Sequence, residues 1–303
     1  MELVKGTTQL QLEQPTAVSF GKFDGLHMGH KLLVERLLTQ KKEGLQTVAF
    51  SFDVPPALVT GGQEAKVLTT NEEKIFVFSK TGIDYLIEYP FTDEIRNMEA
   101  IVFLEKIVAD LHVRHIIVGT DFRFGYNRKG DAQLLKEQAK RLGYRLDIVE
   151  KMQYGHRDIS STMIRKFIAE GQVETANLLL GYPYFMQGVV ECGKKIGRTI
   201  GIPTVNLLPA SEKLLPPYGA YASRITVNGK SYSGITNIGD NPTVEHTGFT
   251  KVESHIFDFH EMIYGQQISV EFLEFLRGEK KFESLEALKK QIEHDIQYVK
   301  SKY

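Results

Sequence analysis

The stretch TAVSFGKFDGLHMGHKLLVERLL, residues 16–38, decides the fold of the first half of the chain. Its apolar start, residues 16–20, predicts a strand, and residues 29–43 predict a helix that stops at Gly44. Between the two, the segment GKFDGLHMGH, residues 21–30, places three glycines, an aspartate and two histidines in a tight polar turn. A core would exclude both histidines, so this turn is the first candidate for a functional site.

The first half of the chain alternates between strand-like and helix-like segments. We expect strands at 16–20, 46–52, 83–89, 114–119 and 145–150. We expect helices at 29–43, from a capping box of Thr70 and Glu73 to Gly82, at about 97–110 and at about 131–142. This alternation predicts a parallel sheet, because parallel neighbours need a crossover connection. The polar loops at 21–30 and 119–131 then lie at the carboxyl edge of the sheet, where such folds bind ligands.

The second half of the chain has a different pattern. After about residue 183, short strand-like runs follow one another without helices between them, and Asn228-Gly229 predicts a type I′ hairpin. Such a series is typical of an antiparallel barrel or sandwich. The closing segment predicts a helix with one apolar face, which we expect to pack against the barrel. The residues of that face are Leu285, Leu288, Ile292 and Ile296.

The composition is that of an ordinary globular protein. With 303 residues the chain is long for a single core, so we expect two domains, an α/β domain at 1–183 and an all-β domain at 184–303. A net charge of −1 argues against nucleic-acid binding by bulk electrostatics. The single cysteine, Cys192, fits a reducing compartment. With no apolar leader or long apolar span, we expect a cytoplasmic protein without a membrane partner, either a monomer or a weak homo-oligomer.

His27 and His30 can share one face at the start of the predicted helix, because they are three residues apart. A helix N-terminus carries unpaired N–H groups and a positive partial charge, so it suits phosphate. Two imidazoles there can donate to phosphate oxygens and stabilise charge in a transition state. Two alternatives stay open. The histidines could only cap a glycine-rich turn, or, less favoured because the only cysteine is distant, they could bind zinc.

The motif HMGH, residues 27–30, matches the HxGH signature of the nucleotidyltransferase superfamily. Together with VGTDFRFGYNRKGD (118–131) and ISSTMIRKFIAEG (159–171), it resembles the FMN adenylyltransferase module of bacterial bifunctional riboflavin kinase/FAD synthetases. The resemblance implies a Rossmann-like nucleotidyltransferase domain that uses ATP. Two departures stand out: Met163 replaces a common arginine, and Val54-Pro55-Pro56 replaces a PHP segment.

The same resemblance implies roles for individual residues. His27 and His30 would be catalytic and would hold the ATP phosphates. ATP would be bound by Gly21, Phe23, Asp24, Gly25, His27, His30, Ser161, Thr162 and Arg165. The junction of nucleotide and flavin would be lined by Asp121, Phe122 and Arg128. Without the resemblance, ISST is simply the start of a helix, with Ser160 as a plausible N-cap.

A second glycine-rich segment, GKKIGRTIGIPTVNL (193–207), is not a Walker loop, because its spacing is one residue short and Pro203 interrupts the helix that should follow. It resembles instead the GxxxGRxxGxPTxN motif of riboflavin kinases. ITNIGDNPTVE (235–245) and VESHIFDF (252–259) are further matches to that family. The implied ATP-binding residues are Gly193, Gly197, Arg198, Gly201, Pro203, Thr204 and Asn206.

The resemblance also implies that Thr204 and Asn206 bind Mg²⁺, for which oxygen donors are suited. Glu253 would be the general base on the ribityl hydroxyl of riboflavin, since a primary alcohol is a poor nucleophile. Flavin would be bound by Asn241, Glu253 and Arg277. The alternative for Glu253 is an outward strand residue in an ion pair, and we expect His255 and His260 to be structural.

These motifs cover nearly the whole chain and imply a bifunctional transferase. The barrel would transfer the γ-phosphoryl group of ATP to riboflavin, giving FMN and ADP. The α/β domain would transfer AMP from a second ATP to FMN, giving FAD and pyrophosphate. Mg²⁺ is the expected cofactor, and riboflavin, FMN and ATP are the expected partners. Two alternatives stay open: a riboflavin kinase whose adenylyltransferase activity is weak or lost, with Met163 as the reason, and a flavin or nucleotide sensor without turnover.

Overall fold

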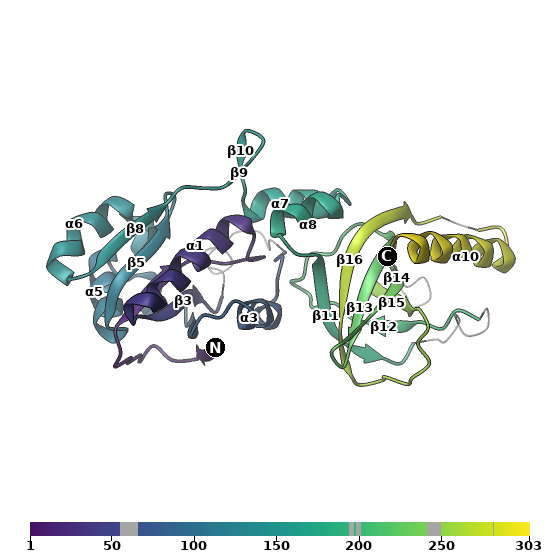
Figure 1. The fold of residues 1–303 in the computed structure, drawn as a ribbon, viewed down its shortest axis with the longest axis horizontal. Helices are drawn as coiled ribbons and strands as arrows, with labels where there is room; N and C mark the ends of the chain where they lie inside the picture. Colours follow the sequence, from purple (N-terminus) through teal and green to yellow (C-terminus); the bar gives the residue numbers. More distant parts are fainter. Residues whose placement is uncertain (55–65, 194–196, 198–200, 241–249, 281) are drawn as a thin grey trace. The chain divides into compact units, whose positions relative to one another are not determined.

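The computed structural model describes residues 1–54, 66–193, 197, 201–240, 250–280 and 282–303 (Figure 1). Within them the chain forms two compact units, Met1–Ser161 and Thr162–Tyr303. The first unit contains a parallel sheet with helices, and the second contains a closed antiparallel barrel. The predicted fold class is therefore confirmed for both halves of the chain.

A six-stranded parallel sheet forms the centre of the first unit, in the order β1-β4-β3-β2-β5-β8. Its strands are β1 (Glu2–Lys5), β2 (Thr16–Phe20), β3 (Gln46–Phe52), β4 (Tyr85–Tyr89), β5 (Val113–Gly119) and β8 (Arg145–Val149). All but β1 lie where the sequence predicts a strand. β1 escapes prediction because a four-residue edge strand with no fully buried side chain leaves little hydrophobic pattern to detect.

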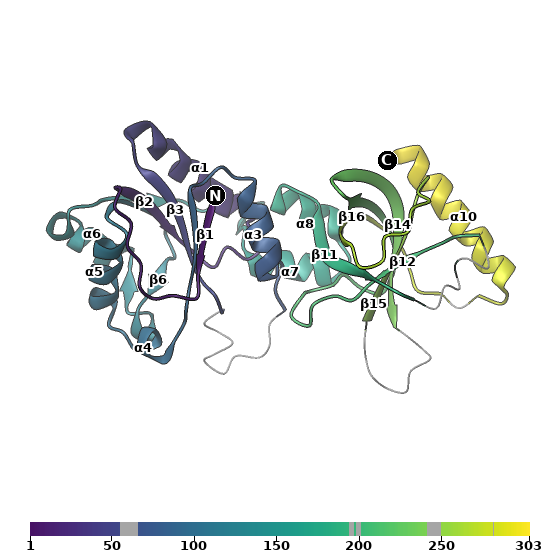
Figure 2. The same cartoon turned by 90° about the horizontal axis from the view of Figure 1, so that it is seen from below.

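Helices cover both faces of this sheet (Figure 2). One face packs α1 and α3 around Leu86, and the other packs α5 and α6 around Ile116. The elements are α1 (Met28–Thr39), η1 (Gln40–Glu43), α3 (Asn71–Ser79), α4 (Asp93–Arg96), α5 (Ala100–Asp110), η2 (Tyr126–Arg128) and α6 (Ala132–Leu142). The capping box is confirmed: Thr70 Oγ1 accepts from the backbone N–H of Glu73, and the Glu73 carboxylate accepts from that of Thr70.

Two short hairpins complete the first unit. β6 (Arg123–Phe124) pairs with β7 (Gly130–Asp131) after β5, and β9 (Gln153–Tyr154) pairs with β10 (Arg157–Asp158) after β8. The β9–β10 hairpin is exposed and projects from the sheet (Figure 1). Both hairpins follow the carboxyl ends of parallel strands, so they flank the edge where the sequence predicts ligand binding.

Helix α7 (Ser161–Ala169) begins at the last residue of the first unit, and the rest of it belongs to the second. The second unit also contains α8 (Val173–Leu180) and a closed barrel in the order β11-β12-β15-β14-β13-β16. Every neighbouring pair of barrel strands is antiparallel. The strands are β11 (Tyr184–Glu191), β12 (Val205–Leu207), β13 (Gly219–Val227), β14 (Lys230–Asp240), β15 (Thr250–Ile256) and β16 (Gln267–Gly278). The expected hairpin is confirmed, since Asn228 and Gly229 take positive φ (48° and 77°) between β13 and β14.

The C-terminal helix α10 (Leu285–Lys302) packs on the outside of the barrel (Figure 1). Val299 is fully buried there with Ala222 and Leu273, and Ile296 packs against this cluster. Leu285, by contrast, is 61 % exposed, so the predicted apolar face is wrong at its first residue. In both views the first turn of α10 extends beyond the barrel strands, and the contact lies further along the helix.

Candidate active sites

The turn after β2 follows a strained backbone path that buries its apolar side chains. Phe23 and Leu26 have positive φ (51° and 33°), a conformation that is costly for residues other than glycine. Burial offsets this cost, because Phe23 and Leu26 are only 0 % and 2 % exposed. The Phe23 ring packs edge-on against Phe78. Phe23, a predicted ATP contact, therefore anchors the turn in the core with its side chain.

His27 and His30 lie ring on ring where α1 begins. Their ring centroids are 3.7 Å apart, with 17° between the ring planes. His27 is the N-cap, and its Nδ1 accepts from the backbone N–H of His30 at 3.4 Å. The capping alternative is therefore correct for His27. It does not explain His30, whose Nδ1 is buried and has no hydrogen-bond partner in the described part of the chain, as expected where a ligand completes a site.

Gly29 makes this stacking possible. A Cβ at Gly29 would lie 3.2 Å from two atoms of the His27 ring, closer than a side chain normally approaches. A larger residue would force the His27 ring to shift by a few tenths of an ångström. The glycine of the HxGH motif thus leaves space for the His27 ring in this structure.

Burial sets the protonation state of both rings. It lowers the pKa of His27 to about 4, and the Asp121 carboxylate opposes this effect only in part. Burial, and next the neighbouring His27, lower the pKa of His30 well below 6.5. Both imidazoles are neutral at pH 7, so each carries one N–H group that can donate to a phosphate oxygen.

The Asp24 carboxylate braces the turn through backbone groups. Its Oδ1 accepts from the N–H groups of Leu68 and Thr69, at 2.8 and 3.1 Å. Thr69 Oγ1 accepts in turn from the N–H of Gly25 at 3.1 Å. The Asp24 carbonyl accepts from Ser161 Oγ at 2.9 Å. The structure therefore brings the three predicted ATP-site residues Asp24, Gly25 and Ser161 together, and these hydrogen bonds hold the turn in shape.

The loop after β5 brings an aromatic ring and a carboxylate to the same edge of the sheet. The Phe122 ring stacks on Phe20 and Phe124, with centroids 5.6 and 5.4 Å away. Asp121 is exposed, and its charge acts on His27. Arg128 is exposed and has φ of 58°. Asp121 therefore lies within electrostatic reach of His27, and its place at the nucleotide–flavin junction stays a prediction.

Lys151, just after β8, is a charged neighbour that the sequence does not reveal. Its Nζ lies 2.9 Å from Asp121 Oδ2 and 3.4 Å from Asp158 Oδ2. The contact joins the ends of two strands that neighbour each other only in the folded sheet. Because Lys151 belongs to no recognisable motif, the sequence alone does not predict that it lies at this site.

The remaining residues of the ISST motif lie on α7. Helix α7 begins at Ser161, so Ser160 occupies the predicted N-cap position. Arg165 Nη2 donates to Thr162 Oγ1 at 3.2 Å, and Met163 lies between them on the helix. Thr162 and Arg165 thus meet each other, and their predicted contact with the triphosphate stays a prediction.

In the barrel, Asn206 of β12 and Glu253 of β15 are direct cross-strand partners. Asn237 of β14 partners Glu253 on its other side. Cross-strand partners point to the same face of a sheet, so these three polar side chains form one row. The adjacent pair Leu207 and Val252 is buried, which places the polar row on the outside of the barrel. Among the described residues Glu253 has no ion-pair partner, so the ion-pair alternative finds no support.

The glycines of the second motif shape the backbone around Asn206. A Cβ at Gly193 would lie 2.2 Å from Asn206 Nδ2, so only glycine allows this approach. A Cβ at Gly197 would lie 2.2 Å from the carbonyl oxygen of Ile202, whose N–H donates to the Gly197 carbonyl at 2.7 Å. Asn206 Oδ1 is buried and finds no hydrogen-bond partner in the part of the chain that the structure covers.

His255 supports the same segment. Its Nδ1 donates to the Pro203 carbonyl at 2.7 Å, which fits the expected structural role. Gly201 has a positive φ of 79° and leads into this segment. The predicted site residues Arg198 and Asn241, and Pro55-Pro56 of the first domain, lie outside the described residues.

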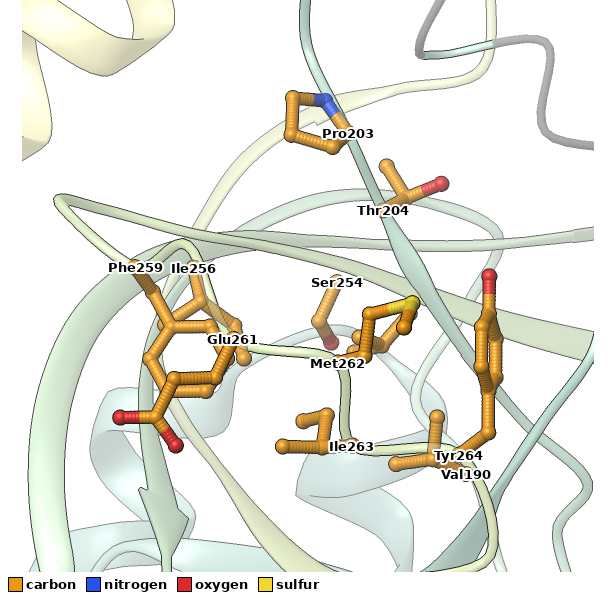
Figure 3. A pocket seen from close by; sticks show the side chains of 11 residues that line it. Val190, Pro203, Thr204, Ser254, Ile256, Phe259, Glu261, Met262, Ile263 and Tyr264 are labelled. Atoms are coloured by element: carbon orange, nitrogen blue, oxygen red, sulfur yellow. The ribbon is translucent and has the colours of Figure 1, made fainter.

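A solvent-open pocket of about 440 Å³ lies beside Thr204 (Figure 3). The segment leading into β12 supplies Pro203 and Thr204, and the segment after β15 supplies Met262 and Tyr264. The other lining residues are Val190, Val205, Ser254, Ile256, Phe259, Glu261 and Ile263. The accessible lining of the pocket is about equally polar and apolar. The sequence singled out Thr204 but missed the opposite wall.

Arg277 is held by a buried carboxylate from α10. Its Nε donates to Asp295 Oδ2 at 2.9 Å, and Gln291 donates to Asp295 Oδ1 at 2.8 Å. Arg277 and Asn237 both pair with Ala220 of β13, so the guanidinium belongs to the continuation of the polar row. The sequence missed Asp295, because an amphipathic pattern assigns the buried face of a helix to apolar residues.

The described residues contain no group of three or more His, Cys, Asp or Glu side chains placed to hold a metal ion. A zinc site at His27 and His30 therefore finds no support in them. Any metal at either site would need ligands from a substrate, such as phosphate oxygens, in addition to protein groups.

Two family profiles match the chain. The family described as FAD synthetase matches residues 9–163, and the family described as riboflavin kinase matches residues 180–303. The bifunctional riboflavin kinase/FMN adenylyltransferase of Listeria monocytogenes is 36% identical over 92% of this chain and 90% of its own length. The protein of the same description from Haemophilus influenzae is 34% identical, over 99% of each chain.

A solved structure shares the fold. The crystal structure described as a macrolide-efflux protein from Streptococcus pneumoniae has a TM-score of 0.87 and 27% identity, over 99% of this chain and 98% of its own. The word efflux in that description refers to the Streptococcus protein. In this chain, no helix within the described ranges combines the length and the apolar character that crossing a membrane requires.

Proposed function

Because the chain belongs to the bifunctional riboflavin kinase/FMN adenylyltransferase family, it is a transferase that makes FMN and FAD, and we propose how its residues divide the two reactions. Residues 1–183 carry adenylyl transfer, and residues 184–303 carry riboflavin phosphorylation. The observation that carries this division is the direct pairing of Asn206 with Glu253, which joins two kinase motifs in one row on the barrel.

In adenylyl transfer, a phosphate oxygen of FMN attacks the α-phosphorus of ATP. A new P–O bond forms, the bond between the α-phosphorus and the bridging oxygen to the β-phosphorus breaks, and pyrophosphate leaves with the electron pair. Neutral His27 and His30 donate N–H groups to the phosphate oxygens as this charge develops. Thr162 and Arg165 bind the leaving pyrophosphate.

In riboflavin phosphorylation, Glu253 accepts the proton of the ribityl hydroxyl while that oxygen attacks the γ-phosphorus of ATP, and ADP leaves. The neighbours of Glu253 in the row are the amides of Asn206 and Asn237. Because these amides are uncharged, they can orient the carboxylate without removing its capacity as a base. Arg277, oriented by Asp295, contacts the flavin.

The kinase row also fits Mg²⁺. Asn206 Oδ1 is a buried oxygen without a hydrogen-bond partner in the described chain, and the Thr204 hydroxyl lies two residues before it. Both are hard oxygen donors, which Mg²⁺ prefers. We assign Thr204 and Asn206 as the protein groups that hold the ion together with the ATP phosphates. When bound, Mg²⁺ neutralises part of the phosphate charge.

The pocket beside Thr204 accepts the adenine base of the ATP used by the kinase. Tyr264 offers an aromatic ring and Met262 a polarizable side chain along one wall (Figure 3). Thr204 lines the pocket and lies two residues before Asn206, which is the observation that connects the pocket with the proposed phosphate site. Glu261 adds a carboxylate to the pocket for base or ribose recognition.

The single cysteine fits a reducing compartment, so we place the protein in the cytoplasm, and we keep the expectation of a monomer or a weak homo-oligomer. Met163, in place of a common arginine, supports a second candidate in which adenylyl transfer is weak.

Two separate half-reactions decide between the candidates. Purified protein with Mg²⁺ and ATP is given riboflavin in one assay and FMN in the other. FMN with ADP in the first and FAD with pyrophosphate in the second support both activities. Formation of FMN alone supports the second candidate. If neither FMN nor FAD forms, both candidates are refuted.

A further inference from the structure

Lys151 connects two loops at the carboxyl edge of the parallel sheet. Its Nζ lies 2.9 Å from Asp121 Oδ2, after β5, and 3.4 Å from Asp158 Oδ2, in β10. The Lys151 side chain is 32 % exposed, against 69 % for Asp121 and 45 % for Asp158. Lys151 thus has the least exposed side chain of the three, and contact with Asp121 raises the pKa of its ammonium group, which keeps it protonated.

Asp121 is the carboxylate whose charge acts on His27 against the effect of burial. It therefore lies within electrostatic reach of His27, one of the two rings that receive ATP phosphates in the proposed reaction. Both substrates of adenylyl transfer are anions, and an uncompensated carboxylate at this place would repel them. A cation that stays bound to Asp121 would remove much of that repulsion.

We propose that Lys151 is a positioning residue of the adenylyl-transfer site, which holds Asp121 in place and compensates its charge so that anionic substrates bind beside His27. This inference rests on the proposed function of the α/β unit. The group of Lys151, Asp121 and Asp158 carries one net negative charge, and it carries two when Lys151 is removed. Removing the charge of Asp158 instead makes the group neutral.

A purely structural role makes a different prediction. If Lys151 only anchored the β9–β10 hairpin through Asp158, loss of either partner would loosen the hairpin and weaken the site. If Lys151 compensates Asp121, loss of Lys151 weakens substrate binding, whereas loss of the Asp158 charge leaves binding unchanged or improves it. Asp158→Asn is therefore the matched control for Lys151→Met, because it breaks the same cluster with the opposite change in charge.

The test measures KM and kcat for FAD formation from FMN and ATP. Lys151→Met is expected to raise the KM of ATP or FMN about three- to five-fold with little change in kcat, and Lys151→Arg to restore it. The effect is expected to shrink between about 20 mM and about 300 mM KCl, because salt screens exposed charges. An unchanged KM in Lys151→Met, or a KM raised equally in Asp158→Asn, overturns the proposal.

A second measurement does not depend on turnover. The pKa of His27, followed by NMR of its ring protons, is expected to be higher in Lys151→Met than in the unchanged protein, because Asp121 is then uncompensated. An unchanged His27 pKa contradicts the charge compensation even if activity is lost. Absence of FAD formation in the unchanged protein, with the NMR shift present, would refute the proposed function and leave the electrostatic role of Lys151 standing.

Discussion

Asn206 and Glu253 face each other across β12 and β15 as direct register partners. This pairing brings together a glycine-rich loop and a separate strand that are far apart in the sequence. It also sets an uncharged amide, whose oxygen has no hydrogen-bond partner among the residues that the structure describes, beside a carboxylate. A phosphoryl-transfer site needs both a metal-binding oxygen and a base, and here each comes from one strand of the pair.

Glu253→Gln is expected to lower riboflavin phosphorylation about 100-fold or more, because glutamine keeps the shape of the side chain but accepts no proton. Conversion of FMN to FAD is expected to stay within about two-fold of the unchanged protein. Coupled detection of ADP and chromatography of the flavins measure both steps. Glu271→Gln makes the same chemical change on β16, where Glu271 forms a surface ion pair with Arg224, and is the control for general damage to the barrel. Full kinase activity in Glu253→Gln would remove its assigned role.

Substitution of the stacked histidines is expected to produce the opposite pattern. His30→Gln or His27→Gln removes an N–H donor to the developing phosphate charge, so FAD formation from FMN is expected to fall about 100- to 1000-fold. Riboflavin phosphorylation is expected to remain. His156→Gln, on the exposed β9–β10 hairpin, controls for the loss of a histidine in the same unit. Equal loss of both activities from folded His30→Gln protein would contradict two separate sites.

Gly29→Ala tests whether the ring stack itself matters. Alanine raises helix propensity by about 1 kcal/mol, so the fold is expected to hold. Its Cβ, however, would lie 3.2 Å from the His27 ring and displace it. We expect FAD formation to fall about ten-fold while the thermal midpoint stays the same or rises. Thermal unfolding and the FMN adenylylation rate are the measurements, and unchanged adenylylation would show that the stack tolerates displacement.

Acid sensitivity of the α/β unit follows from the buried histidines. The pKa of His27 is about 4 in the folded protein against 6.5 as the ordinary value, so protonation favours the unfolded chain. The contribution of neutral His27 to stability is complete above about pH 6.5 and is lost as the pH falls from there toward 4, by roughly 3 kcal/mol.

Urea unfolding of the unchanged protein and of His27→Gln at several pH values between 4 and 7.5 measures this contribution. The variant is expected to lose less stability on acidification than the unchanged protein. His30 and His115, whose pKa values are also lowered by burial, continue to contribute in both proteins. Identical pH dependence of the two proteins would mean that His27 is not buried in a neutral state.

Much of the fold follows from local patterns. Buried strands such as β5, the capping box at Thr70 and the Asn228-Gly229 turn each leave a signal within a few residues, and the structure confirms them. The pattern does not predict β1, because this strand forms by pairing with β4. Nor does it predict the exposure of Leu285, which depends on where the barrel ends. Hydrophobic pattern carries no information about such contacts.

Some residues of the candidate sites could be predicted from the sequence, and others could not. His27, His30, Asn206 and Glu253 could be named from motifs, whose residue types suit phosphate chemistry. Lys151, Asp295 and the wall formed by Met262 and Tyr264 could not, because each acquires its partners only when distant segments meet. Phe23 and Asp24 belong to the same motif as the histidines, yet their side chains hold the turn in shape.

The central claim is that two independent sites act in sequence, and a mixing experiment tests it most directly. His27→Gln protein with riboflavin, ATP and Mg²⁺ is expected to stop at FMN, and Glu253→Gln protein is expected to leave riboflavin unchanged. Combined in one solution, the two variants are expected to form FAD from riboflavin, because FMN released by the first is adenylylated by the second. If each variant alone completes its remaining half-reaction and the mixture still makes no FAD, FMN does not pass between separate sites through solution. If a single substitution abolishes both half-reactions in folded protein, the two-site account is wrong.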